Sequence, residues 1–249
     1  MNDQAVETKR WWSQAILIGG VIAVVCLPLG ALGTKIGLWE FTGGFMLLAA
    51  GAVLATLASF LGVLAYIVCL RNGLTLERPA VLIGVLLGVL VLAVLGMQYS
   101  RASSVPPIHN ISTDTVNPPQ FDKIVAIRNA AKANPLAYDA AVLGPQQAAA
   151  YPEVKSLELM APVGETLDRA EAVMRAMGLE IVAVNKSSGL VEATATTFWF
   201  GFKDDVAVRV ASGANGGSVV DVRSVSRVGQ SDLGANAARI GEILNGLSG

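Results

Sequence analysis

The chain has 249 residues, of which 53% are hydrophobic and 15% are charged, and its formal net charge is −1. A near-neutral chain lacks the basic surface that nucleic-acid binding needs, so we expect no nucleic acid among its partners. The two cysteines, Cys26 and Cys69, both lie in apolar stretches, where we expect them to act as small packing residues.

Three stretches without a charged side chain, residues 13–33, 43–70 and 79–98, occupy the first hundred positions. Each is long enough for a membrane-spanning helix, which needs roughly 20 residues to cross about 30 Å of hydrocarbon. After Ser100 the composition becomes that of a soluble α+β domain. The sequence therefore predicts a three-helix anchor in the lipid bilayer over residues 1–99.

Basic residues indicate the orientation of this anchor. Lys9 and Arg10 precede the first stretch, and Arg71 and Arg78 flank the second loop, whereas the loop at 34–42 carries only Lys35, balanced by Glu40. The positive-inside rule then predicts a cytoplasmic amino terminus and a periplasmic domain from residue 100 onward. The expected location is a bacterial inner membrane.

Small residues recur at helical spacing in two of the stretches. Such ridges let helix backbones approach closely in lipid. They either pack within this chain or dock onto other membrane subunits. The residues concerned are Gly51, Ala55 and Ser59 in the second stretch, and Ala80, Gly84 and Gly88 in the third.

Residues 100–120 are predicted to form an extended, proline-rich arm, because Pro106-Pro107 and Pro118-Pro119 restrict the backbone. The arm holds the only histidine, His109, near Ser112 and Asp114. These residue types occur in hydrolytic triads, but a triad needs a geometry that an extended run seldom provides. We therefore interpret His109 and Asp114 as a structural or recognition loop, with no catalytic residue and no metal site.

In the domain at residues 121–249, the predicted order of helices and strands is α-β-β-β-β-α. A short helix is expected over 121–132, an irregular wrap over 135–155, and a helix ending at Gly178. Four strands follow, at 179–184, 190–197, 204–211 and 218–227, before a last helix at 232–247. Alternating apolar residues predict a four-stranded antiparallel sheet in a two-layer sandwich, with helices on one face.

Four aromatics in five positions, Phe198, Trp199, Phe200 and Phe202, join the second and third strands. They belong either to the core or lipid interface, or to an exposed patch for a partner or an apolar ligand. Arg223 and Arg227 end the last strand, and Asp232 opens the last helix, with Ser231 as a candidate cap. The arginines act either as an anion site or, the interpretation that we favour, as internal struts that pair with aspartates.

Several of these segments together resemble a bacterial family, the domain of unknown function fourteen-ninety-nine. The resemblance covers about residues 104–247 and leaves out the anchor. Gln230 stands where the family pattern has a basic residue. The resemblance implies a bacterial envelope protein and carries over no catalytic residue. It rests on the runs 108–114, 118–121, 151–152, 193–205 and 222–236.

The sequence thus predicts a membrane-anchored periplasmic accessory protein that docks to another envelope protein or membrane complex and is not an enzyme. The alternative is a binder of lipid or another apolar ligand through the aromatic turn, and a hydrolase-like enzyme ranks third. No cofactor is expected.

Overall fold

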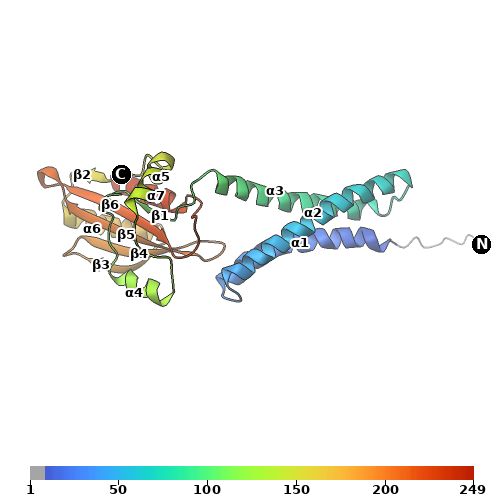
Figure 1. The fold of residues 1–249 in the computed structure, drawn as a ribbon, viewed down its shortest axis with the longest axis horizontal. Helices are drawn as coiled ribbons and strands as arrows, with labels where there is room; N and C mark the ends of the chain where they lie inside the picture. Colours follow the sequence, from blue (N-terminus) through green and yellow to red (C-terminus); the bar gives the residue numbers. More distant parts are fainter. Residues whose placement is uncertain (1–8) are drawn as a thin grey trace, which may run out of the picture. The chain divides into compact units, whose positions relative to one another are not determined.

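The computed structural model describes residues 9–249, which fold into two compact units (Figure 1). The first holds the described residues up to Ser100 together with Phe198–Gly201. The second holds Arg101–Thr197 and Phe202–Gly249.

The first unit contains three helices, each long and apolar enough to cross a membrane: α1 (Trp11–Lys35), α2 (Phe41–Arg71) and α3 (Arg78–Ser103). Every predicted stretch lies inside one of them. Basic residues lie in the last turn of two of these helices, Lys35 in α1 and Arg71 in α2. Composition and length are therefore those of a membrane anchor.

The small residues of α3 face the other two helices of the unit. A Cβ atom added to Gly84 would lie 2.7 Å from the carbonyl oxygen of Ile16 in α1. One added to Gly88 would lie 2.5 Å from Ser59 Oγ in α2, and Ala80 is buried as well. No side chain fits at either glycine without moving the helices apart, so this ridge packs within the chain.

The small residues of α2 pack against α1 in the same way. A Cβ atom on Gly51 would lie 3.0 Å from Cys26 Cβ. Ala55 is fully buried and forms an apolar cluster with Ala23 and Val91. Both cysteines are free and buried.

A carboxylate from the α2–α3 loop caps the start of α1. Glu77 is buried and accepts hydrogen bonds from the Arg10 backbone N–H at 3.0 Å and from Ser13 Oγ at 2.9 Å. Arg10 itself provides no side-chain cap. Because the amides at a helix start lack partners within the helix, this carboxylate stabilises the end of α1.

The second unit is built on one antiparallel sheet of six strands, where the sequence predicted four. Their order is β1-β6-β5-β4-β3, and β2 pairs with β6 beyond the end of β1. The two additional strands have only three residues each, too few to show an alternating pattern. The strands are β1 (Asn110–Ser112), β2 (Leu157–Leu159), β3 (Glu180–Asn185), β4 (Leu190–Thr196), β5 (Lys203–Ser212) and β6 (Ser218–Ser226).

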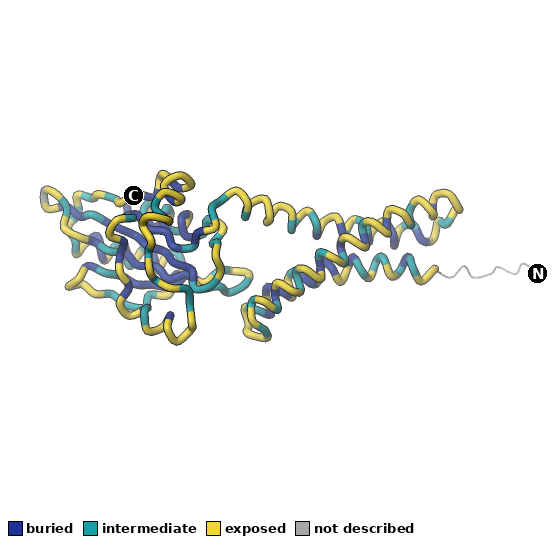
Figure 2. The backbone as a smooth tube through the Cα atoms, viewed as in Figure 1, coloured by how far each residue is buried: buried dark blue, intermediate teal, exposed yellow. Residues whose placement is uncertain are grey.

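Two helices, α6 (Val163–Ala176) and α7 (Ala235–Ser248), cover one face of this sheet. Leu167 and Met174 from α6 and Ile240 from α7 meet Val206 and Val208 of β5 in the main hydrophobic core. In Figure 2 the central strands of the sheet are drawn mostly in the dark blue of buried residues. Gly178 ends the α6 segment with φ +80°, as predicted. The predicted α+β layering is present on this face.

The other face is covered too, which corrects the expectation of helices on one face only. The helix α4 (Lys123–Ala130) contacts β3 and β4, and Phe121 and Ile124 pack on Ala207 of β5. Glu192 and Thr194 alternate with the apolar core residues of β4, a pattern typical of a solvent-facing side, but both are buried beneath this cover. The cover consists of residues 113–138, which follow β1 and cross the sheet.

The region 135–155, expected to be irregular, contains a helix, α5 (Ala140–Ala150), despite Pro145. Asp139 caps it by accepting from the N–H groups of Ala141 and Val142 at 3.1 and 3.2 Å. The stability that this cap adds offsets part of the loss from the intrahelical hydrogen bond that Pro145 cannot donate. One turn of 3₁₀-helix, η1 (Ala214–Gly216), joins β5 to β6.

Candidate functional site

The aromatic turn, residues 197–202, is a closed loop between β4 and β5. Thr197 N–H donates to the Phe202 carbonyl at 2.8 Å, and Phe202 N–H donates to Thr197 Oγ1 at 2.9 Å. Gly201 adopts φ +68°, a conformation that side chains other than glycine's disfavour. Phe198 and Trp199 project from this frame and remain 72% and 57% exposed.

The rings of the turn take different environments. Phe198 and Trp199 pack edge to face, with ring centroids 5.2 Å apart. Within the first unit, Phe200 packs against Phe45 at 5.3 Å, and Lys35 Nζ donates to the Phe198 carbonyl at 2.8 Å. β4 ends at Thr196, so the strand alternation does not extend to these rings. The exposed part of the turn is the pair Phe198–Trp199.

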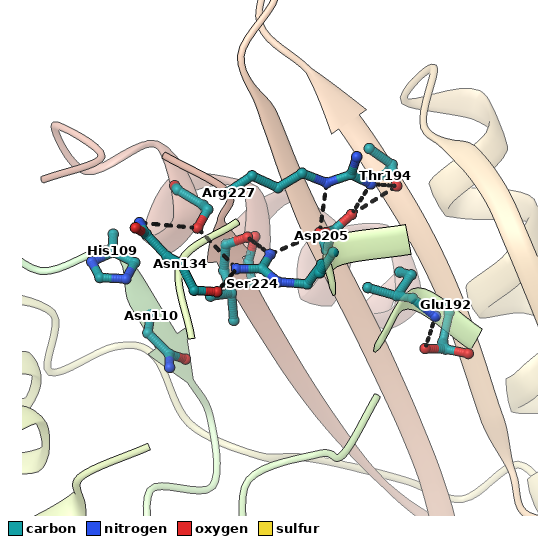
Figure 3. A network of polar contacts seen from close by, with 12 residues as sticks. His109, Asn110, Asn134, Glu192, Thr194, Asp205, Ser224 and Arg227 are labelled. Carbon is teal, nitrogen blue, oxygen red and sulfur yellow. Dashed lines mark hydrogen bonds and ion pairs between the residues drawn. The ribbon is translucent and has the colours of Figure 1, made fainter. Parts of the chain in front are cut away.

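Asp205 of β5, three residues after the turn in the chain, forms a buried ion-pair centre (Figure 3). Arg128 Nη1 and Arg227 Nε donate to its Oδ2 at 2.7 and 2.9 Å, and Arg227 Nη2 and Thr194 Oγ1 donate to its Oδ1 at 2.7 and 2.8 Å. Burial alone would raise the pKa of Asp205, but these donors outweigh it and hold the pKa below its usual value. Arg227 is therefore an internal strut.

Arg223 is buried on the covered face of the sheet. Burial lowers the pKa of its guanidinium to about 10. Its hydrogen-bond partners and the two rings beside it lie in residues 110–138, so Arg223 links this segment to β6. It donates to Asn110 Oδ1 at 3.1 Å, to the Pro119 carbonyl at 3.2 Å and to the Leu136 carbonyl, with the rings of Phe121 and Tyr138 beside it.

Glu192 of β4 holds the start of α4 on the same face. Its carboxylate accepts from the N–H groups of Asp122 and Lys123 at 2.8 Å each and of Ile124 at 3.3 Å. A buried carboxylate at a helix amino terminus satisfies both the free amides and the helix dipole. Neither Glu192 nor Arg128 was predicted as a site residue, whereas Asp205, with Asp204 and Asp232, was among the aspartates expected to pair with the arginines.

His109 and Asp114 do not form a catalytic arrangement. His109 Nδ1 lies 3.4 Å from the Gln230 carbonyl, whereas Asp114 accepts from the N–H groups of Val116 and Asn117 and pairs with Arg209 at 3.0 Å. Burial opposes the charge of Asp114, yet these hydrogen bonds and Arg209 lower its pKa. Ser112 between them donates to the backbone carbonyl of Asp114. The run consists of β1 and the turn that follows it, and its polar groups are bound by different partners.

Asp232 caps the last helix, which begins three residues later than predicted. Its carboxylate accepts from the N–H groups of Gly234 at 2.8 Å and Asn236 at 2.9 Å, while Ser231 Oγ accepts from Leu233. Burial raises the pKa of Asp232 despite these bonds. The helix start is thus occupied by the chain's own carboxylate, and Arg223 and Arg227 donate their hydrogen bonds to other groups.

Two clefts of about 350 and 330 Å³ lie in the second unit. Arg239, Glu242 and Thr196 line the first together with Met177 and Leu179, so it lies between α7, the end of β4 and the connection that follows α6. Thr113, Gln147 and Lys155 line the second beside Tyr151. Both volumes are at the low end for small-molecule pockets, and neither cleft is lined by apolar side chains alone.

A known family model matches most of the second unit. No curated protein sequence matches the chain. Residues 110–247, more than half of the chain, match the model of a family described as "Protein of unknown function (DUF1499)". The match spans all six strands, including both short ones. The chain therefore belongs to the DUF1499 family, and its membrane-type helices precede the family domain.

Proposed function

We propose that this protein is a membrane-anchored accessory domain that docks another envelope protein through the exposed pair Phe198–Trp199. Large aromatic side chains are enriched at protein interfaces, where they bury much area with little loss of conformational freedom. Here two of them stand exposed on a turn that its own hydrogen bonds close. This exposed pair is the observation that carries the proposal.

The anchor in this proposal is formed by α1, α2 and α3 in a bacterial inner membrane. Their length and apolar composition support insertion. The charges of Lys9, Arg10, Arg71 and Arg78 favour a cytoplasmic amino terminus and hence a periplasmic domain. A reporter that is active only outside the cytoplasm, fused after Gly249, is expected to be active.

Binding is favoured over catalysis because charged groups of the domain pair with one another. Asp205 is bound by Arg128 and Arg227, and Asp204 pairs with Arg239 at 2.8 Å. Such side chains hold strands and helices together. The pair Phe198–Trp199 has no comparable structural task.

A photo-crosslinking experiment tests the docking surface. The photoreactive residue p-benzoylphenylalanine replaces Trp199 in the full chain in native membranes, and Met160, an exposed residue of the β2–α6 connection, is replaced as the matched control. We expect a discrete protein adduct at position 199 that is absent at position 160.

Other outcomes separate the competing interpretations. Adducts to lipid alone at position 199 would favour the alternative, a lipid-binding turn, over protein docking. Equal adducts at both positions, or none at 199, would contradict the proposal. Thermal unfolding of each variant verifies that the substitution has left the fold intact.

A further inference from the structure

Leu233, in the loop between β6 and α7, is an exposed leucine in an unfavourable backbone conformation. Its φ is +56°, its side chain is 53% exposed, and it belongs to neither hydrophobic cluster of the second unit. The left-handed region is costly for a leucine and free of cost for a glycine. A side chain kept at such a position without packing into the domain indicates a contact outside the domain.

The loop holds this side chain in a fixed position. The Asp232 carboxylate binds the N–H groups of Gly234 and Asn236, and Ser231 Oγ accepts from Leu233 N–H at 3.2 Å. Gly234, with φ +83°, absorbs the turn into α7. Leu233 is therefore presented by a closed loop and needs little ordering before it binds.

The same loop is bound to the segment that follows α3. Asp232 N–H donates to the Ile108 carbonyl at 3.3 Å, and Asn236 Nδ2 donates to the His109 carbonyl at 3.0 Å. A Cβ atom on Gly234 would lie 3.8 Å from Val105 Cγ1. Val105 is only two residues beyond Ser103, the last residue of α3.

This covalent connection limits how far the loop can lie from the bilayer. If Tyr99 marks the interface, as aromatic residues at span ends do, the helix from Tyr99 to Ser103 adds about 6 Å. The two residues to Val105 add at most about 7 Å. Val105 then lies within about 13 Å of the hydrocarbon edge, and the headgroup layer occupies roughly 5–7 Å of this distance.

We propose that the β6–α7 loop rests on the bilayer surface and inserts Leu233 among the lipid headgroups. The inference rests on the proposed function, since it requires that α3 crosses the membrane. The bilayer is the occupant that the chain connection supports, because the few residues between α3 and Val105 keep the loop near its surface. An apolar side chain at that depth gains burial and adds a second attachment to the helical anchor.

Fluorescence quenching tests the contact in the full chain, reconstituted in vesicles of phosphatidylethanolamine and phosphatidylglycerol. Leu233→Cys carries an NBD fluorophore, in a background with Cys26→Ala and Cys69→Ala. Met160→Cys is the matched control, because Met160 is 82% exposed. Met160 follows β2, which pairs with the first residues of β6, whereas Leu233 lies beyond the last residue of β6. Headgroup spin-labelled lipid should reduce emission at position 233 roughly twofold and leave position 160 unchanged.

The outcomes distinguish the inference from the proposed function. If alkaline carbonate leaves the protein in the vesicles and position 233 is quenched no more than position 160, the loop contact is refuted and the anchor stands. If carbonate extracts the protein, the anchor fails and the inference fails with it. Quenching at 233 that requires another membrane protein in the vesicles would also overturn lipid contact.

Discussion

Replacing Asp205 with asparagine should strongly destabilise the domain. Asp205 accepts three hydrogen bonds from Arg128 and Arg227, at 2.7–2.9 Å, and a fourth from Thr194. Charge-assisted bonds contribute about 1.5–3 kcal/mol each, and desolvation of the ions offsets part of this sum. Asparagine leaves two largely buried guanidinium groups without a counter-charge, so we expect a loss of about 3–5 kcal/mol in the free energy of unfolding.

Pulse proteolysis of the full chain in micelles, over a urea series, measures this loss. Asp168→Asn is the matched control, since the Asp168–Lys186 pair is solvent-exposed and its removal should change little. The folded-state pKa of Asp205 is lowered, so its contribution is present above the unfolded pKa of about 4 and is lost as pH falls below that value. The difference between wild type and Asp205→Asn should therefore shrink at acidic pH. A loss no larger than that of Asp168→Asn at pH 7 would refute the reasoning.

Two further predictions concern helix packing and helix capping. Gly88→Leu should disrupt the three-helix unit, because its Cβ would lie 2.6 Å from the Ala55 carbonyl oxygen. The control Gly96→Leu meets open space and should be tolerated. The temperatures at which the two variants aggregate in micelles test this difference. Asp232→Ala should cost about 1 kcal/mol at pH 7 through loss of the α7 cap, whereas Asp232→Asn keeps a cap and should cost less. Because the folded-state pKa of Asp232 is raised, the protonated carboxyl adds stability that is complete below the unfolded pKa and is lost as pH rises through the folded pKa. The advantage of the wild type over Asp232→Asn in urea unfolding should therefore grow toward pH 4.

The four longer strands could be predicted from the sequence because their alternating valines and alanines face a core built by α6 and α7. β1 and β2 could not, since three residues carry no period and both are defined by pairing with β6. The burial of the second face of the sheet could not be predicted for a related reason. Glu192 and Thr194 alternate like solvent-facing residues, and only the folded position of residues 113–138 buries them.

The candidate site was predictable in part. The aromatic turn was visible as an anomaly of composition, and the strut interpretation of Arg227 included Asp205 among its partners. Arg128 could not be identified, because its ion pair spans 77 residues and its helix has no unusual pattern. Arg223 differs from the expected pairing with an aspartate, since it contacts backbone carbonyls, an asparagine and two rings.

Several charged residues and two rings of the protein depart from the usual rule that charged residues are exposed and aromatic residues are buried. Asp205, Glu192 and Arg223 are buried, and each has partners that explain its position. The pair Phe198–Trp199 has no such explanation, because the contact of Lys35 with the Phe198 ring leaves that ring largely exposed. Exposed rings lower solubility and add nothing to the core, so their retention on a closed turn is best explained by a surface outside the chain. The proposed docking therefore rests on this turn.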